Sequence, residues 1–141
     1  MPRRPQTAAD LNEIGRNRLP GLLGIDVTQS AEGRVEAELR IRPELLAPNG
    51  FLHGGTVITL ADSCCGYGAF TTLPDGATGF TTIELKTNFL GTVRDGLIRC
   101  VATPSHLGRT TQVWDAVVTA DGKDKPLAQF RCTQLVLWPR P

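Results

Sequence analysis

The alternation of apolar and polar residues predicts strands on both sides of one long apolar helix. In residues 34–41, RVEAELRI, every second residue is apolar and most of the others are charged. This pattern is typical of a strand with one face in solvent. A less regular strand at 24–29 precedes it across a turn at 31–33. Four further strand-like runs follow later in the chain, at 79–90, 96–104, 110–120 and 127–138.

Two helices are predicted between and before these strands. Residues 8–18 form a short amphipathic pattern that ends near Pro20, and a longer apolar run extends from His53 to about Thr71 after a loop at 43–50. Strands in series with short turns predict an antiparallel meander, and the apolar helix must be buried on its concave side. The fold class is therefore α+β, without the alternating helices and strands of a βαβ nucleotide-binding fold.

Composition narrows the class of protein. The 141 residues fit one domain with an N-terminal extension at 1–19, and 40% hydrophobic and 21% charged residues are ordinary globular values. The net charge of +1 disfavours a nucleic-acid partner. No run approaches the ~18 apolar residues that span a bilayer, and no secretory signal follows the two N-terminal arginines. Four cysteines without metal or redox spacing predict reduced thiols, a cytoplasmic location and no structural zinc.

Asp62 is an acidic residue in the middle of the apolar helix. It shares a helical face with small and apolar residues, namely Gly55, Ile58, Cys65, Gly66 and Ala69. That face leaves space beside the carboxylate, where burial raises the pKa toward values useful for proton transfer. The alternative is an aspartate that reaches solvent or pairs with an arginine.

The start of the same helix is a candidate site for a carbonyl oxygen. Gly54 and Gly55 allow a ligand to approach the backbone, and the first N–H groups of a helix have no intrahelical acceptor. The alternative is that both glycines only pack against a strand. Eight residues separate Gly54 from Asp62, which is ~12 Å along a helix. If both groups are catalytic, two antiparallel copies must share the site, because a carbonyl must lie within ~3 Å of its donor and near its base.

The motif N-G-x-x-H-G-G-x6-D at 49–62 resembles that of hotdog-fold acyl-CoA thioesterases, most closely the phenylacetate-pathway and 4-hydroxybenzoyl-CoA type. The strand SHLGRTTQVWDAVV at 105–118 agrees with this resemblance, which extends over about 20–138. It implies a curved sheet of about six strands around one central helix. It also implies a homodimer or homotetramer that binds acyl-CoA across the protomer interface, with no cofactor beyond the coenzyme A of the substrate.

The resemblance also implies catalytic roles. The Gly54 N–H polarises the thioester carbonyl, while Asp62 of the partner subunit activates water or attacks the carbonyl itself. His53 orders the loop, and Asn49 either takes a polar role or shapes the turn. Two positions depart from the family pattern, since Ala47 and Gly66 stand where relatives often carry polar residues. Thr82 is the candidate to hold the water that Gly66 cannot hold.

Residues for binding coenzyme A phosphates are expected outside this motif. The candidates are His106, Arg109 and Thr110, with Arg94 and Lys86 as weaker ones. Gly55 and Gly66 are expected as further substrate-binding positions. No Gly-x-Ser-x-Gly motif supplies a serine nucleophile. Cys64 and Cys65 are interpreted as packing residues.

Three functions remain open at this point. The first is hydrolysis of an acyl-CoA thioester. The second is hydration or dehydration of an acyl-CoA, for which the aspartate and histidine spacing fits poorly. The third is non-catalytic acyl-CoA binding. Small and medium side chains around Ile58, Cys65, Gly66 and Phe80 are expected to line an acyl pocket, which admits aromatic or medium-chain groups alike.

Overall fold

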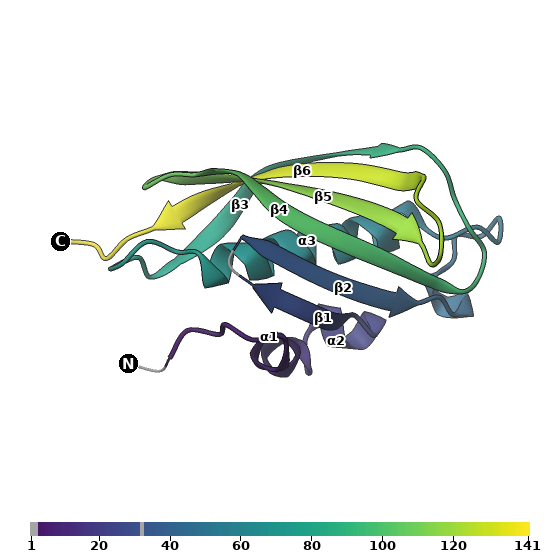
Figure 1. Cartoon of the computed structure of the whole chain (residues 1–141), viewed down its shortest axis with the longest axis horizontal. Coiled ribbons are helices and arrows are strands. Elements are labelled where there is room, and N and C mark those ends of the chain that lie inside the picture. Colours follow the sequence, from purple (N-terminus) through teal and green to yellow (C-terminus); the bar gives the residue numbers. More distant parts are fainter. Residues whose placement is uncertain (1–2, 32) are drawn as a thin grey trace.

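One six-stranded sheet curves around the long helix in the computed structural model, which describes residues 3–31 and 33–141 (Figure 1). The turn expected at 31–33 includes Glu32, which lies outside the described residues, as do residues 1–2 of the N-terminal extension. The elements are α1 (Ala8–Gly15), α2 (Leu19–Leu23), β1 (Asp26–Ala31), β2 (Arg34–Arg40), a 3-10 turn (Pro43–Leu45), α3 (Gly54–Thr71), β3 (Gly79–Phe89), β4 (Leu97–Leu107), β5 (Thr111–Ala120) and β6 (Pro126–Leu137).

The strand order is β1-β2-β4-β5-β6-β3, and every neighbouring pair is antiparallel. The predicted meander of four strands is correct for β4, β5 and β6 but wrong for β3, which pairs with β6 at the edge of the sheet. The cause is α3, which crosses the concave side after β2 and delivers β3 to the far edge. The connection at 90–96 then returns the chain to the position beside β2.

The end of one strand and the end of one helix also differ from the prediction. β4 continues to Leu107, past Pro104, because this proline lies at an irregularity where the register with β5 shifts. The single helix expected at 8–18 ends at Gly15, and the separate α2 contains Pro20 in its first turn, where the missing N–H has no intrahelical acceptor.

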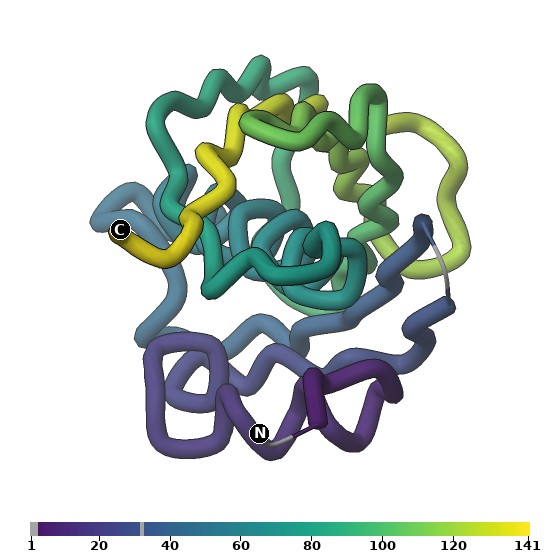
Figure 2. Tube along the Cα trace, turned by 90° about the vertical axis from the view of Figure 1, so that its left-hand side faces the viewer, coloured from purple at the N-terminus to yellow at the C-terminus, as the bar shows by residue number. Residues whose placement is uncertain are grey.

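The core lies between α3 and the sheet. Figure 2, which looks along the long axis, shows the teal coil of α3 with the strands beside and above it and the purple α1 and α2 beneath. α3 packs against β2, β3, β4, β5 and β6. Trp114 on β5 is fully buried against α3, and an added Cβ at Gly68 would overlap its ring, so glycine allows the close approach of helix and sheet. In the described part of the chain, no helix combines the length and apolar character needed to cross a membrane.

Candidate active site

His53 forms the N-cap of α3 and fixes the first turn of the helix. Its Nδ1 accepts a hydrogen bond of 2.8 Å from the N–H of Gly55. Gly54 lies between these two residues at the first position of the helix. Its N–H finds no acceptor among residues 3–31 and 33–141. A free N–H at the positive end of a helix dipole is suited to bind an oxygen that gains negative charge.

A pocket of about 310 Å³ lies beside Gly54. Its lining combines apolar side chains with backbone from two loops and comprises Ala47, Asn49, Phe51, Leu52, Gly54, Val57, Phe89, Gly91, Thr92 and Leu127. This set differs from the expected acyl lining, because none of Ile58, Cys65, Gly66 and Phe80 is part of it. Instead, Phe80 packs against Gly66, where an added Cβ would lie 3.4 Å from the Phe80 Cζ.

Asn49 lines this pocket and also shapes its rim. Its Oδ1 accepts a hydrogen bond of 3.1 Å from the Phe51 N–H, which is the two-residue spacing of an Asx turn. The side-chain amide of Asn49 donates to no acceptor in the described part of the chain, so it is available to a ligand beside Gly54. Both interpretations from the sequence therefore stay compatible with the geometry.

Asp62 is half-buried on α3, and its Oδ1 is buried without a hydrogen-bond partner in the described chain. Burial raises the pKa of this carboxyl above its ordinary value of 3.8. None of the ion pairs among the described residues includes Asp62. The arginine-paired alternative therefore does not hold among the described residues, whereas a partly exposed carboxylate is compatible both with contact to solvent and with a group kept for a reaction.

The edge strand β3 runs antiparallel to α3 and passes Asp62. An added Cβ would lie 3.0 Å from Phe89 at Gly54 and 3.4 Å from Phe80 at Gly66, so the two elements touch near both ends. The twelve helical steps from Gly54 to Gly66 rise ~18 Å, and the nine strand steps from Phe89 to Phe80 span ~30 Å. Asp62 lies two thirds of the way along the helical interval, so linear interpolation places it opposite about residue 83, next to Thr82.

Thr82 is exposed at this edge, and its hydroxyl donates a hydrogen bond of 2.6 Å to Oε1 of Gln134 on β6. Gln134 is a residue that the sequence analysis missed. It occupies an inward position of β6 and is fully buried, and the pattern RCTQLVL carries the signal, since a glutamine replaces an apolar residue in the alternation.

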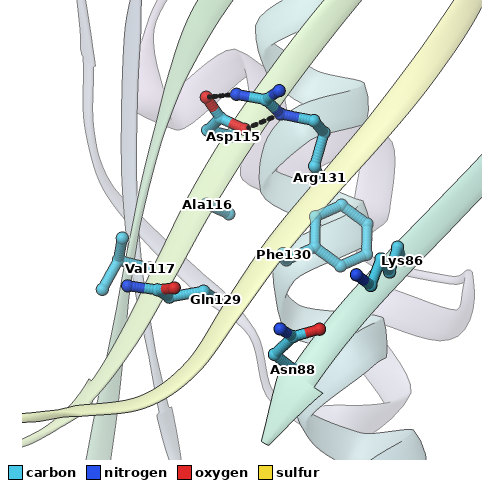
Figure 3. Close-up of a pocket in the computed structure, with 8 residues that line it drawn as sticks. All are labelled: Lys86, Asn88, Asp115, Ala116, Val117, Gln129, Phe130 and Arg131. Carbon is cyan, nitrogen blue, oxygen red and sulfur yellow. Dashed lines mark hydrogen bonds and ion pairs between the residues drawn. The ribbon is translucent and has the colours of Figure 1, made fainter.

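Lys86 lies apart from these groups, on the outer face of the sheet. It is in register with Arg131 on β6, and both line a pocket of about 440 Å³ (Figure 3). Figure 3 shows Arg131 paired with Asp115. The guanidinium donates from Nε to Oδ1 at 2.6 Å and from Nη2 to Oδ2 at 2.9 Å, and this pairing neutralises its charge. The structure therefore does not bring Lys86 together with Gly54 or Asp62 in one chain.

His106, Arg109 and Thr110 lie around the connection from β4 to β5, at the end of the sheet near the C-terminus of α3. The Arg109 guanidinium stacks over the Trp138 ring at 4.1 Å, and Trp138 Nε1 donates to the Arg109 carbonyl at 3.1 Å. Within one chain these residues are at the opposite end from Gly54. Arg94 is nearer, stacked at 4.2 Å on Phe51 of the Gly54 pocket.

All four cysteines are buried, free thiols in the core. Cys64 contacts Cys100, and Cys65 contacts Cys132. The neighbouring thiols and burial raise the pKa of both Cys65 and Cys100. Cys65 and Cys100 are therefore held as thiols, and all four cysteines are buried, as expected of packing residues rather than nucleophiles.

A curved antiparallel sheet around one helix defines the hotdog class, and here the helix also has a His-Gly-Gly start and a half-buried acid. The sequence model of the Thioesterase superfamily matches residues 49–126. The chain belongs to this family of enzymes, which confirms the resemblance and the fold expected from its sequence.

Individual relatives agree with this assignment. The chain is 31% identical to 1,4-dihydroxy-2-naphthoyl-CoA hydrolase of Listeria monocytogenes, over 79% of this chain and 89% of that protein. It is 30% identical to the Escherichia coli protein of the same name, over 96% and 98%. A mutant thioesterase from Pseudomonas aeruginosa superposes with a TM-score of 0.88 at 30% identity, covering 96% of each chain.

Proposed function

We propose that this protein hydrolyses an acyl-CoA thioester, with Gly54 of one subunit and Asp62 of another acting on the same carbonyl. The observation that carries the proposal is the pair of unsatisfied groups on α3. Gly54 offers a free N–H beside a pocket, and Asp62 offers a buried carboxylate oxygen without a partner. The buried Asp62 oxygen is costly unless a ligand satisfies it, and the partly exposed Gly54 N–H is accessible to the same ligand.

The reaction uses these groups in sequence. The thioester oxygen accepts a hydrogen bond from Gly54 N–H, which stabilises the negative charge that develops during attack. Asp62 takes a proton from water as the water oxygen bonds to the carbonyl carbon. The carbon–sulfur bond then breaks, and the thiolate of coenzyme A leaves and is protonated. No cofactor is required in this scheme.

A direct attack by Asp62 on the carbonyl is the alternative role for the carboxylate. It would form a mixed anhydride that water then hydrolyses. A single turnover in ¹⁸O water can identify the anhydride route, because ¹⁸O enters the aspartate only when water attacks the Asp62 carboxyl carbon of the anhydride. We favour the general base, because the raised pKa suits proton transfer.

The shared site requires at least a dimer, and β3 supplies the means to form one. β3 is an 11-residue edge strand whose apolar side chains are largely exposed, with Ile83 at 56% and Phe89 at 51%. An open, apolar edge of this length favours pairing with another strand. Two copies joined through β3 place their α3 helices side by side and antiparallel. The proposed site needs only this dimer, and a homotetramer of two such dimers would contain the same site.

The antiparallel arrangement also explains the position of the expected phosphate-binding residues. It places the C-terminal end of one α3 beside the Gly54 pocket of its neighbour. His106, Arg109 and Thr110 of one subunit then flank the pocket of the other. This supports their role in binding the phosphates of coenzyme A, with Arg94 at the mouth of the pocket on the near side.

The acyl group is proposed to be aromatic. Two relatives are named as hydrolases of 1,4-dihydroxy-2-naphthoyl-CoA, and the pocket beside Gly54 has aromatic walls in Phe51 and Phe89. The free, buried cysteines are typical of a reducing compartment, which supports a cytoplasmic location.

A panel of aromatic and straight-chain acyl-CoA substrates, assayed for released thiol, tests the proposal. We expect faster release from aromatic substrates, and we expect Asp62→Ala to lose about 100-fold or more in turnover while remaining folded. Binding of acyl-CoA without thiol release would instead identify a non-catalytic binding protein.

A further inference from the structure

Two glutamines lie side by side in the core, on β5 and β6. Gln112 and Gln134 are in register and are both fully buried. A polar side chain in a core is retained only where its hydrogen bonds are satisfied, and it usually has a structural or functional reason. The partners of the two glutamines differ, and the difference indicates different roles.

Both ends of the Gln112 side-chain amide form hydrogen bonds that hold the fold together. Its Oε1 accepts a hydrogen bond of 2.8 Å from the indole Nε1 of Trp114. Its Nε2 donates a hydrogen bond of 3.2 Å to the carbonyl of Thr72, at the C-terminus of α3. Gln112 therefore ties the end of α3 to the sheet.

Gln134 connects the edge strand to the helix that carries Asp62. Its Oε1 accepts from Thr82 at 2.6 Å, and its Nε2 donates to Cys132 Sγ at 3.5 Å. Cys132 in turn contacts Cys65, which lies almost one turn after Asp62. One end of this chain of contacts is thus at the carboxylate, and the other end is at the hydroxyl opposite it.

The direction of the Thr82 bond determines what Thr82 offers to a ligand. Because the hydroxyl proton is committed to Gln134, the Thr82 oxygen presents only lone pairs. A water molecule between Asp62 and Thr82 has two protons to donate. The water donates one hydrogen bond to the carboxylate and the other to the hydroxyl oxygen. A lone pair of the water then points away from both groups and toward a carbonyl carbon.

We propose that Gln134 is a positioning residue for hydrolysis, since it fixes the Thr82 hydroxyl as an acceptor for the attacking water. The inference rests on the proposed function and adds to it a buried residue that touches neither substrate nor water. Without Gln134 the Thr82 proton is free to point at the water or at Asp62, and the water loses its fixed orientation.

The test compares Gln134→Leu with Thr82→Val and with the double variant. We expect kcat to fall about 10-fold or more in each single variant with KM little changed, because orientation and not substrate affinity is lost. The double variant is expected to be no worse than either single one, since both remove the same hydrogen bond. Thr82→Ser keeps a hydroxyl and is expected to keep most of the turnover.

Gln112→Leu is the matched control, because it removes an equally buried glutamine from the neighbouring strand. We expect it to lower the melting temperature and to leave kcat per folded enzyme unchanged. Thr82→Val removes the same bond from the exposed strand, so an unchanged kcat in this variant would overturn the proposal even if Gln134→Leu does not fold.

Two results overturn the role of Gln134. These are an unchanged kcat in Gln134→Leu or in Thr82→Val, and losses that multiply in the double variant. Asp62→Ala in the same assay separates this inference from the proposed function. Low turnover in Asp62→Ala with normal turnover in Gln134→Leu removes only Gln134, whereas full turnover in Asp62→Ala removes the proposed base.

Discussion

Asp62 keeps one carboxylate oxygen buried and without a partner in the described part of the chain, on the helix whose first N–H, that of Gly54, is also free. At the scale of the residue, the buried Asp62 oxygen costs stability in the isolated chain, and the Gly54 N–H stays available to an acceptor. A protein retains such groups where a ligand or a second chain completes them. The proposed chemistry follows from the missing partners, because the Gly54 N–H can bind a carbonyl oxygen and the Asp62 carboxylate can accept a proton from water.

The raised pKa of Asp62 predicts the pH dependence of turnover. The proposed base acts only when ionised, and burial raises its pKa above 3.8, so the protonated, inactive form persists to higher pH than for an ordinary aspartate. We expect kcat to fall as the pH is lowered, with a midpoint above 3.8. A pH profile of kcat that stays flat down to pH 4 would exclude a carboxylate with a raised pKa as the base.

The same shift predicts that Asp62→Asn is more stable than the natural protein. Between 3.8 and the raised pKa of the folded state, the folded protein binds the proton more tightly, so stability falls as pH rises through this window. The penalty persists at neutral pH, where asparagine removes it. We expect a higher melting temperature for Asp62→Asn at pH 7 and no such gain below 3.8, together with loss of turnover. Equal melting temperatures at pH 7 would show that the carboxylate is well solvated.

The sequence was sufficient to find Asp62 and the His-Gly-Gly start, because both are local features of one helix. It was not sufficient for Gln134, whose proposed positioning role depends on its pairing with Thr82 on the neighbouring strand β3. The expected acyl lining around Gly66 and Phe80 stays a prediction, since these two residues pack against each other and do not line the pocket beside Gly54. Such contacts are set by sheet order and strand register, which a single sequence does not encode locally.

At the scale of the element, α3 is both the core of the fold and the carrier of the site. Its length and bounds were predictable from the apolar run and the glycines at its start. The order of the strands around it was not, because β3 follows α3 in the chain but lies at the far edge of the sheet. Turn residues predict where a strand ends, and they do not say which strand becomes its neighbour.

The N-cap of α3 allows the role of His53 to be tested. His53 accepts the Gly55 N–H through Nδ1, and loss of an N-cap costs about 1 kcal/mol. We expect His53→Ala to lower both stability and turnover, and His53→Asn to retain most of both, because asparagine is a good N-cap. Equal, large losses of turnover in the two variants, with Asn restoring stability, would instead show that the imidazole transfers protons.

At the scale of the whole molecule, the proposed site is complete only when two chains meet. The open edge of β3 is the proposed contact, and Ile83 is its most exposed apolar side chain. We expect Ile83→Lys to give a monomer without turnover, as measured by analytical ultracentrifugation and thiol release. Leu22→Lys, at a still more exposed apolar position on α2, serves as the control and is expected to change neither. An active Ile83→Lys monomer would contradict a shared site.

Complementation between two inactive variants tests the shared site most directly. Gly54→Pro removes the N–H at a helix position that tolerates proline, and Gly54→Ala controls for the added Cβ, which would lie 3.0 Å from Phe89. Each of Gly54→Pro and Asp62→Ala is expected to be inactive alone. Because a mixed dimer holds one intact site, chains refolded together in equal amounts should recover about a quarter of the natural activity. A mixture as inactive as its two components would show that Gly54 and Asp62 do not act across subunits.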